Sequence, residues 1–341
     1  MAASTAAVGA LAYVALDILR GTLGRHGDHL RVTSLNVLNP NLAKPTWFDD
    51  PTGVALDPKF RKDAFIQWLK TQKDKDVICL QEIVPEWFYD ALCDPTLRKR
   101  WVGYFDGYSG RWGDKMGVAV FVRKDLDVVG VRNVRLGEVV EGELPGVSHT
   151  TAHDAYDKSV EYSALDELLT SEQSYLGVRI YKDGETVEVG TVHMPCRFRG
   201  TTQGVMTTAH AALETIARTT VFPVLIVGDM NDETDGTTKY QLLVEKAGGD
   251  AAEEYDPRSS RHPEVVKNLF AEPSVLHVVH GEHPTTWVQP PGGKDKIVKR
   301  LDWGLYKDLA VSASSVDPDG PVPSLAWFSD HVPVEYRVTR A

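Results

Sequence analysis

Several features are scarce in this sequence of 341 residues, and each scarcity excludes a class of protein. The three cysteines, Cys79, Cys93 and Cys196, are few and odd in number, which favours a reducing compartment over a disulfide framework and offers no zinc spacing. Basic residues are outnumbered, with 37 Lys and Arg against 48 Asp and Glu and a net charge of −11. Such a surface argues against coating long nucleic acid, because phosphates repel it. It leaves open an enzyme that holds one or two nucleotides through a metal.

Long apolar runs are also missing. Ala6 to Leu19 is apolar except for Asp17, and it is too short to span a bilayer comfortably. It lacks a basic start and an obvious cleavage site, which argues against a secretory signal. We expect residues 1–29 to form an apolar helix, or a targeting or anchoring segment that allows membrane association. The protein is therefore expected to be intracellular and cytoplasmic, with an organellar or membrane-associated location left open.

The remaining sequence alternates apolar strand patterns with helical spacing. No repeat, low-complexity tract or linker divides it, and 42% of the residues are hydrophobic, so residues 30–341 are predicted to be one domain. The polar segment at about 138–174 is predicted to be a long insertion in that domain. Strands are predicted at 30–38, 77–80, 117–123, 175–181, 186–193, 224–227, 285–288, 301–306 and 332–338, and helices at 60–70, 85–92, 203–219 and 240–246.

The most informative stretch is VLIVGDMND, at 224–232. Four apolar residues predict a buried strand, and Asp229 and Asn231 are expected to project on one side of an extended segment, with Met230 pointing into the core. A carboxylate accepts a proton or binds a cation, and an amide donates to a phosphoryl oxygen. The alternative is a strand that ends in an ordinary polar turn.

Polar residues also follow or interrupt the other apolar runs. Glu82 comes just after the apolar strand VICL, where a carboxylate is costly unless it is paired or binds a cation. Each such residue alone has an ordinary structural explanation, but together they suggest a shared polar site. The full set is Asn36, Glu82, His193, Asp229, Asn231, Asp302, Asp330 and His331.

These residues lie in the motifs SLNVL, CLQE, VGTVHMP, GDMN, RLDW and FSDH, which in this order resemble those of the endonuclease/exonuclease/phosphatase superfamily from Arg31 to the C-terminus. The resemblance implies an α/β fold, a four-layer α/β/β/α sandwich with two mostly antiparallel β-sheets. It also implies Mg²⁺, for which Mn²⁺ can substitute, and hydrolysis of a phosphate ester by in-line attack of water. Hard oxygen ligands suit that metal.

The resemblance also implies roles for the acidic and amide residues. Glu82 matches the metal carboxylate, Asn36 the residue that supports the metal site or the phosphate, and Asp330 a second acid on the metal side. Asp229 and Asn231 match a pair in which the acid orients or deprotonates water and the amide holds a phosphoryl oxygen.

The two histidines have different implied roles. His193 matches a residue that binds the scissile phosphate, and His331 a residue that polarises the phosphate or acts as an acid or base. Asp302 matches the acid that orients His331, and such a pair fixes the tautomer and favours the charged imidazolium. Whether Asp229 or His331 activates the water stays open.

Within the superfamily, SLNVLNPNLA, KMGVAVFVRK and GDMNDETDGTTKYQLLVEKAG are most similar to the deadenylase, nocturnin and 2′,5′-phosphodiesterase group. This implies a 3′–5′ exoribonuclease acting on RNA or oligonucleotides, with no obligate protein partner. Alternatives are a phosphatase or phosphodiesterase for a small molecule or lipid (an inositol phosphate, sphingomyelin or a nucleotide cofactor) and a non-catalytic binding module. Non-scissile phosphates are predicted to contact Arg111, Lys115, Arg197 and Arg199, which otherwise are ordinary surface charges.

Overall fold

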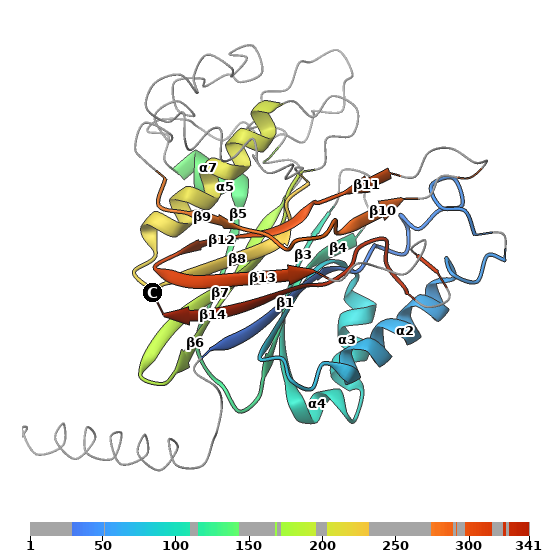
Figure 1. The fold of residues 1–341 in the computed structure, drawn as a ribbon, viewed down its shortest axis with the longest axis horizontal. Coiled ribbons are helices and arrows are strands. Elements are labelled where there is room, and N and C mark those ends of the chain that lie inside the picture. The colour runs from blue at the N-terminus through green and yellow to red at the C-terminus, as the bar shows by residue number, and fades with distance from the viewer. Residues whose placement is uncertain are drawn as a thin grey trace, which may run out of the picture.

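The computed structural model describes residues 29–50, 52–109, 115–142, 168, 172–195, 203–231, 274–288, 291, 297–315, 323–324 and 327–340. These residues form two six-stranded sheets, a two-stranded ribbon and flanking helices (Figure 1). The ribbon pairs β10 (Thr286–Val288) with β11 (Ile297–Lys299). None of the helices in these ranges is long and apolar enough to cross a membrane.

Each large sheet contains one parallel strand pair at its centre, and all its other pairs are antiparallel. The parallel pairs are β1–β2 and β7–β8. The first sheet has the order β13 (Leu309–Ser315), β14 (Val334–Arg340), β1 (Leu30–Asn36), β2 (Val77–Ile83), β4 (Lys115–Arg123), β3 (Trp101–Ser109). The second has the order β5 (Asp127–Arg135), β6 (Ser174–Lys182), β7 (Glu185–His193), β8 (Val224–Asp229), β12 (Asp302–Lys307), β9 (His277–Val279).

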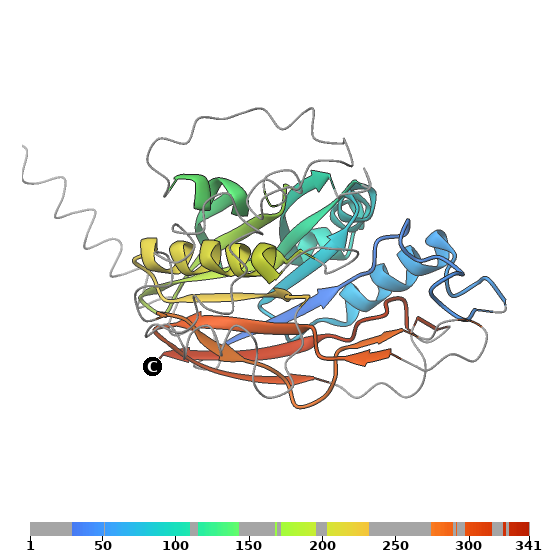
Figure 2. The same ribbon diagram turned by 90° about the horizontal axis from the view of Figure 1, so that it is seen from above.

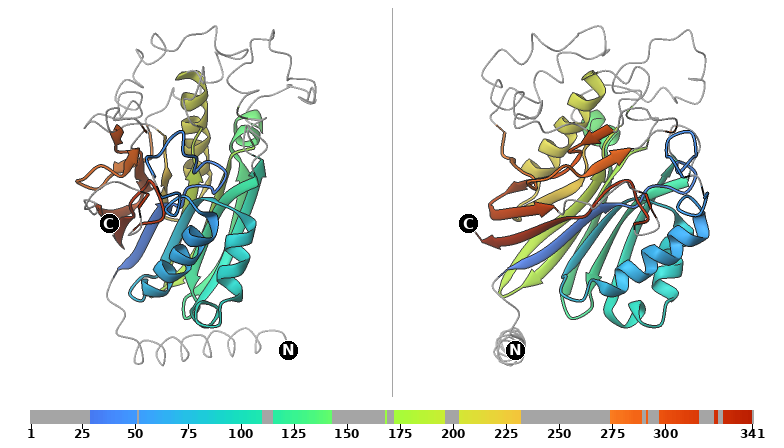
Figure 3. Two further views of the ribbon diagram at one scale, coloured as in Figure 1. Left: turned by 90° about the vertical axis from the view of Figure 1, so that its right-hand side faces the viewer. Right: turned by 45° about the vertical axis from the view of Figure 1, so that its right-hand side comes forward.

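Helices cover the outer faces of the two sheets (Figures 2 and 3). The first sheet packs against α2 (Pro58–Thr71), α3 (Pro85–Cys93) and α4 (Leu97–Arg100), and the second against α5 (Leu136–Gly142) and α7 (Gln203–Thr219). The predicted four-layer α/β/β/α sandwich is therefore confirmed.

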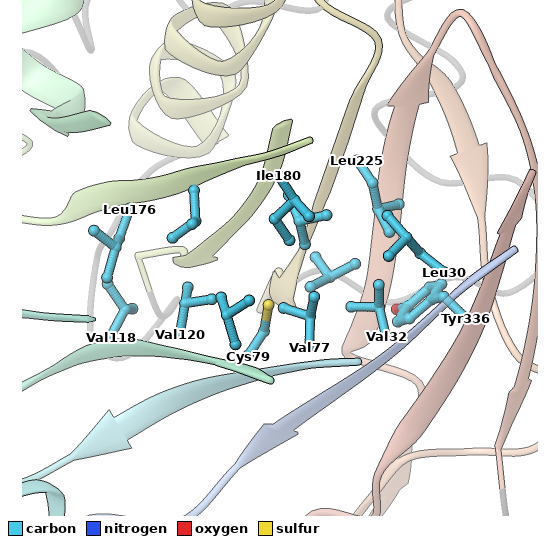
Figure 4. Close-up of a cluster of buried hydrophobic side chains, with 14 of the residues drawn as sticks. Leu30, Val32, Val77, Cys79, Val118, Val120, Leu176, Ile180, Leu225 and Tyr336 are labelled. Carbon is cyan, nitrogen blue, oxygen red and sulfur yellow. The ribbon is translucent and has the colours of Figure 1, made fainter. Parts of the chain in front are cut away.

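Strand alternation produces these layers. In β2, Val77 and Cys79 face the other sheet, whereas Ile78 and Leu80 face the helices. Figure 4 shows the layer between the sheets, where Cys79 and Val120 of one sheet lie opposite residues of the other such as Ile180. Because successive strand residues point to opposite faces, an all-apolar strand is what a sheet buried on both sides requires.

The parallel pairs position the polar residues. Their strands are joined through α2 and α7, respectively, and the carboxyl ends of parallel strands lie at the same edge of a sheet. Asn36, His193 and Asp229 are the last residues of β1, β7 and β8, and Glu82 is the penultimate residue of β2. Gly228 lies within β8, where any side chain would collide with the backbone of β7, so it permits close strand approach and does not end the strand.

The structure differs from the predicted elements in several places. The strands β3, β9, β11 and β13 were not predicted. Glycines and an aspartate interrupt β3, small residues dominate β13, and β9 and β11 are only three residues long. The predicted insertion begins with part of α5, and nearly all the rest of it lies outside the described residues. The predicted N-terminal segment, apart from residue 29, and the predicted helix at 240–246 also lie outside them.

Candidate active site

One carboxylate oxygen is the meeting point of the site. Asp229 Oδ2 accepts a hydrogen bond of 2.9 Å from Asn36 Nδ2. His193 Nε2 and His331 Nε2 each lie 3.7 Å from the same oxygen. The Asp229 side chain is only 3% exposed, so this charge is held in a protein environment where electrostatic interactions are stronger than in water.

Glu82 lies beside this oxygen. Its Oε1 accepts from Asn36 Nδ2 at 3.0 Å and is 3.6 Å from His193 Nε2, and its Oε2 accepts from the Asn39 amide at 2.9 Å. A β-bulge interrupts β2 here, and Glu82 adopts a left-handed backbone with φ of 56°. Regular alternation would turn the Glu82 side chain toward the helices, like that of Leu80, so the strained backbone accompanies its turn toward Asp229.

Asn36 holds the two carboxylates together. Its amide nitrogen donates to Glu82 Oε1 and Asp229 Oδ2, and its oxygen accepts from the Leu38 amide at 2.9 Å. With its nitrogen bonded to both carboxylates, Asn36 acts in this structure as a support for the carboxylate pair.

His193 has a buried tyrosine as its partner. Tyr108 comes from β3 of the other sheet, is 5% exposed, and its hydroxyl lies 2.7 Å from His193 Nδ1. Burial raises the pKa of Tyr108 well above its usual value, and the charges of Glu82 and Asp229 raise it further. The phenol therefore keeps its proton.

His331 has a carboxylate partner instead. Its Nδ1 lies 2.7 Å from Asp302 Oδ2 and 3.1 Å from the Thr286 hydroxyl. Burial by itself would lower the pKa of His331, but the carboxylates of Asp302 and Asp330 raise it well above its usual value. Asp302 is the first residue of β12 and pairs directly with Asp229 of β8. His331 is thus held as an imidazolium beside the central carboxylate.

Asp330 is the least satisfied acid of the site. It is buried, and its Oδ1 has no hydrogen-bond partner in the described part of the chain. Burial raises the pKa of Asp330 to about 6, His331 and Arg61 act in the opposite direction, and Glu82 raises it further. A buried carboxylate oxygen without a donor suits a cation.

Asn231 reaches the site differently from the expectation. The strand β8 ends at Asp229, and Asn231 has a left-handed φ of 49°, so the expected extended segment is wrong. A turn places it instead, in which the Asn231 amide donates to Asp229 Oδ1 at 2.9 Å. Its side-chain nitrogen donates to the Met194 carbonyl at 2.8 Å, which joins the ends of β7 and β8. Met230 points into the core as predicted.

Sequence reasoning missed Arg61. This fully buried guanidinium on α2 donates to the carbonyl oxygens of Val37, Leu38 and Phe328, and so joins the segments that carry Asn36 and His331. Burial lowers its pKa to about 10, opposed by Asp330 and Glu82, and the group stays charged. The signal was present, because Arg61, Phe65 and Leu69 form a single stripe at helical spacing.

Tyr108 and Thr286 were also missed as site residues. Tyr108 lies in the unpredicted strand β3, and no local pattern connects it with a histidine 85 positions later. The prediction placed Thr286 in a strand, which is correct. Its hydroxyl contact with His331 was not predictable, because it arises only where the β10–β11 ribbon packs beside His331.

The predicted substrate contacts are only partly described. Lys115 is exposed at the start of β4 and pairs with Ser109 of β3, next to Tyr108, so it lies at the site's end of the sheet. Arg111, Arg197 and Arg199 lie outside the described residues, and their roles stay predictions.

The donor set fits a divalent cation. Potential ligand atoms of Glu82, His193 and Asp229 lie within 4.8 Å of one another, and so do those of Asp229, Asp302 and His331. In the second set the His331 imidazolium has no lone pair for a metal, so only the two carboxylates can serve. The buried carboxylates include Asp302 and Asp330, each with one oxygen that has no hydrogen-bond partner in the described residues. The charge of the carboxylates exceeds that of the imidazolium and guanidinium around them. A hard cation would balance this charge.

Comparisons with known proteins identify the family and the fold. The sequence model of the Endonuclease/Exonuclease/phosphatase family matches residues 34–331. The fold is similar to that of ANGEL2, a 2′,3′-cyclic phosphatase, in complex with adenosine-2′,3′-vanadate, with a TM-score of 0.62 and 17% identity over 91% of this chain and 95% of that one. A comparison with curated proteins gave no match.

Two further solved structures show the same fold. The human nocturnin catalytic domain with bound sulfate has a TM-score of 0.54 and 16% identity over 92% of this chain and 95% of that one. TDP2 from D. rerio, complexed with a single-strand DNA product, has a TM-score of 0.54 and 13% identity over 92% of this chain and 100% of that one. At such identities the likeness concerns the fold.

Proposed function

Since the chain belongs to the endonuclease/exonuclease/phosphatase family, whose members hydrolyse phosphoester bonds, we propose that it is a Mg²⁺-dependent phosphodiesterase that cleaves RNA or oligonucleotides. The observation that carries this proposal is the convergence of Asn36, His193 and His331 on one oxygen of Asp229, beside Glu82. Related folds that hold adenosine-2′,3′-vanadate and a single-strand DNA product support a nucleotide substrate.

Glu82 and Asp330 would hold the cation, with Asn36 fixing the position of Glu82. A bound Mg²⁺, or Mn²⁺ in its place, neutralises phosphate charge and orients the ester. Asp330 Oδ1, which has no hydrogen-bond donor in the described residues and lies 3.8 Å from His331 Nε2, would gain a partner in such an ion.

The remaining residues act on the water and the phosphate. Asp229 is the proposed group that orients and deprotonates the attacking water, because its buried carboxylate is the hub of the site. The His331 imidazolium, held by Asp302, stabilises negative charge that develops on the phosphoryl oxygens. His193 donates to a non-bridging oxygen. Asn231 Nδ2 uses one hydrogen on the Met194 carbonyl, and its second hydrogen is the proposed donor to another phosphoryl oxygen.

The direction of cleavage forms the finer part of the proposal. The similarity of the opening motif and the GDMN segment to the deadenylase, nocturnin and 2′,5′-phosphodiesterase group favours 3′–5′ exonucleolytic shortening. Lys115, exposed at the site's end of β4, is the described candidate for a contact with a non-scissile phosphate.

A Mg²⁺-dependent digestion panel tests the proposal. The purified protein and its Asp229→Asn variant are incubated with poly(A) RNA, mixed RNA, 2′,5′-linked oligoadenylate, RNA ending in a 2′,3′-cyclic phosphate and duplex DNA. Stepwise loss of nucleotides from the 3′ end by the wild type alone is the expected result. An RNA substrate left intact by folded, Mg²⁺-loaded wild type would overturn it.

A second candidate is hydrolysis of a small or lipid phosphate ester, favoured by the net charge of −11, which disfavours long polyanions. The same panel therefore includes an inositol phosphate, sphingomyelin and NADPH. Product from one of these three, with RNA untouched, would select this candidate.

A further inference from the structure

His193 stands apart from the carboxylates that it faces. Its Nε2 lies 3.6 Å from Glu82 Oε1 and 3.7 Å from Asp229 Oδ2, beyond hydrogen-bond distance, whereas Asn36 donates to the same two oxygens at 3.0 and 2.9 Å. The other ring nitrogen of His193 is held at 2.7 Å by the Tyr108 hydroxyl, which comes from β3 of the opposite sheet.

We propose that Tyr108 is a positioning residue that keeps the hydrogen of His193 on Nε2, so that His193 donates to a phosphoryl oxygen of the substrate and does not ligate the metal. The substrate part rests on the proposed function, and the tautomer and metal parts stand independently of it. His193 could in principle serve either as a donor to the phosphate or as a metal ligand, because its Nε2 also lies within reach of the Glu82 and Asp229 ligand atoms.

The direction of the Tyr108–His193 hydrogen bond follows from the surroundings of the phenol. Tyr108 is buried, and in the described part of the chain its hydroxyl has no hydrogen-bond partner besides His193. If the hydroxyl accepted from His193, its own hydrogen would be buried without an acceptor, which is costly. The hydroxyl therefore donates to Nδ1, and the ring hydrogen resides on Nε2.

A metal ligand would require the reverse arrangement. A histidine that ligates through Nε2 needs a bare lone pair there, and its Nδ1–H donates to a carboxylate, a carbonyl or water. His331 has a carboxylate partner at Nδ1, whereas His193 has a phenol that keeps its proton. The phenol therefore leaves a hydrogen on Nε2 of His193, where a metal ligand would need a lone pair.

The Nε2–H of His193 also remains uncommitted. No acceptor in the described residues lies within hydrogen-bond distance of it, whereas the side-chain nitrogen of Asn36 already bonds to both carboxylates. A ligand oxygen that enters between His193 and Asp229 would meet a ready donor. A phosphoryl oxygen is the ligand atom that such a donor and a neighbouring cation would share.

The first test reads the tautomer directly and needs no substrate. The protein is labelled with ¹⁵N-histidine, and the ring nitrogens of His193 are assigned by comparison with a His193→Gln variant. The expected wild-type spectrum has the hydrogen on Nε2 and an accepting Nδ1, and Tyr108→Phe should shift the Nδ1 signal and mix the tautomers. A wild-type His193 protonated on Nδ1 alone would overturn the proposal.

Tyr175→Phe is the matched control. Tyr175 is also buried and makes a 2.7 Å hydrogen bond to Glu188, which lies outside the candidate site. Both variants lose one buried phenolic hydrogen bond, so they separate a general loss of stability from an effect on His193. The His193 spectrum should change in Tyr108→Phe and stay unchanged in Tyr175→Phe, and equal changes in the two variants would contradict a specific role.

The second test separates metal binding from turnover. Mn²⁺ affinity, measured by electron paramagnetic resonance, should be unchanged in Tyr108→Phe and in His193→Gln, and a tenfold weaker affinity in His193→Gln would show a lost ligand and overturn the proposal. On RNA, Tyr108→Phe should lower kcat by about 10- to 100-fold with little change in KM. If wild type cleaves no RNA, the proposed function fails, while the spectra and the Mn²⁺ data still decide the tautomer and the metal assignment.

Discussion

The two parallel strand pairs, β1–β2 and β7–β8, form similar units whose polar side chains have different hydrogen-bond partners. In each unit the first strand ends in a nitrogen-bearing side chain, Asn36 or His193. The second strand carries a carboxylate at or next to its end, Asp229 in β8 and Glu82 in β2. Both nitrogen groups face both carboxylates, but only Asn36 is within hydrogen-bond distance. In the β1–β2 unit the side-chain nitrogen of Asn36 is therefore already hydrogen-bonded to both carboxylates. In the β7–β8 unit Nε2 of His193 is free to bond to a ligand.

The helices of the two units differ as well. The buried guanidinium of Arg61, on helix α2, donates hydrogen bonds to carbonyl oxygens just after β1 and to the carbonyl of Phe328, shortly before His331. His193 instead depends on Tyr108, which belongs to the opposite sheet. Under the proposed function, this difference corresponds to a division into two tasks: the β1–β2 unit would hold the cation and the β7–β8 unit would act on the substrate.

Exchange of each carboxylate for its amide tests this division and should give the largest effect. Asp229→Asn is expected to lower kcat on RNA by about 10³-fold or more at saturating Mg²⁺, because the hub loses its charge and its basicity. Glu82→Gln should mainly raise the Mg²⁺ concentration needed for half-maximal activity. Initial rates over a Mg²⁺ titration measure both effects.

Glu335→Gln is the control for that titration, because Glu335 is a surface carboxylate paired with Lys75. Its Mg²⁺ dependence and kcat should match those of the wild type. If Asp229→Asn and Glu82→Gln shift the Mg²⁺ dependence equally and leave kcat equal, the two units have no separate tasks.

Removal of the Arg61 guanidinium, which bonds to carbonyl oxygens just after β1, should have the next largest effect, on the stability of the protein. Arg61→Met leaves three buried carbonyl oxygens without their donor, and we expect the free energy of unfolding to fall by about 3 kcal/mol. Lys62→Met, one position along the same helix, removes only a surface ion pair with Asp90 and should cost less than about 1 kcal/mol. Urea unfolding measures both, and similar losses in the two variants would disprove the bracing role of Arg61.

The smallest effect concerns Asp330, the acid that faces the first unit from the segment before β14. Its pKa of about 6 lies above the ordinary value of 3.8, so its contribution to stability is complete below about pH 4 and is lost as the pH rises through 6. Because the shift is about two units, Asp330→Asn should make the metal-free protein more stable than wild type at pH 8, by at most about 3 kcal/mol.

Thermal or urea unfolding in a chelator at pH 4.5 and pH 8 measures this difference. The advantage of Asp330→Asn should be small at pH 4.5 and should disappear at pH 8 when Mg²⁺ is added, because the ion neutralises the wild-type carboxylate. Stability curves that stay parallel across this pH range would contradict the raised pKa.

Residues that follow apolar runs were predictable from the sequence because the cost of an unpaired polar group at a buried strand end is local. Glu82 and Asp229 belong to this class. Their sharing of Asn36 was not predictable, because it depends on how the two sheets stack. Tyr108 was missed for the same reason, since its strand bears Gly103 and Gly107 and its partner lies in the other sheet.

The pairing of β1 with β14 has a consequence for biosynthesis. Ser329 bonds to the carbonyl of Asn36 across 293 positions, and Leu30 of β1 lies opposite Val338 of β14. At about 5–20 residues per second, a ribosome needs roughly 15–60 s to make the intervening chain. During this time β1 can gain only its other neighbour, β2, so its free edge is open to pairing with other nascent chains. The same delay leaves the candidate site incomplete, because His331 belongs to that late segment.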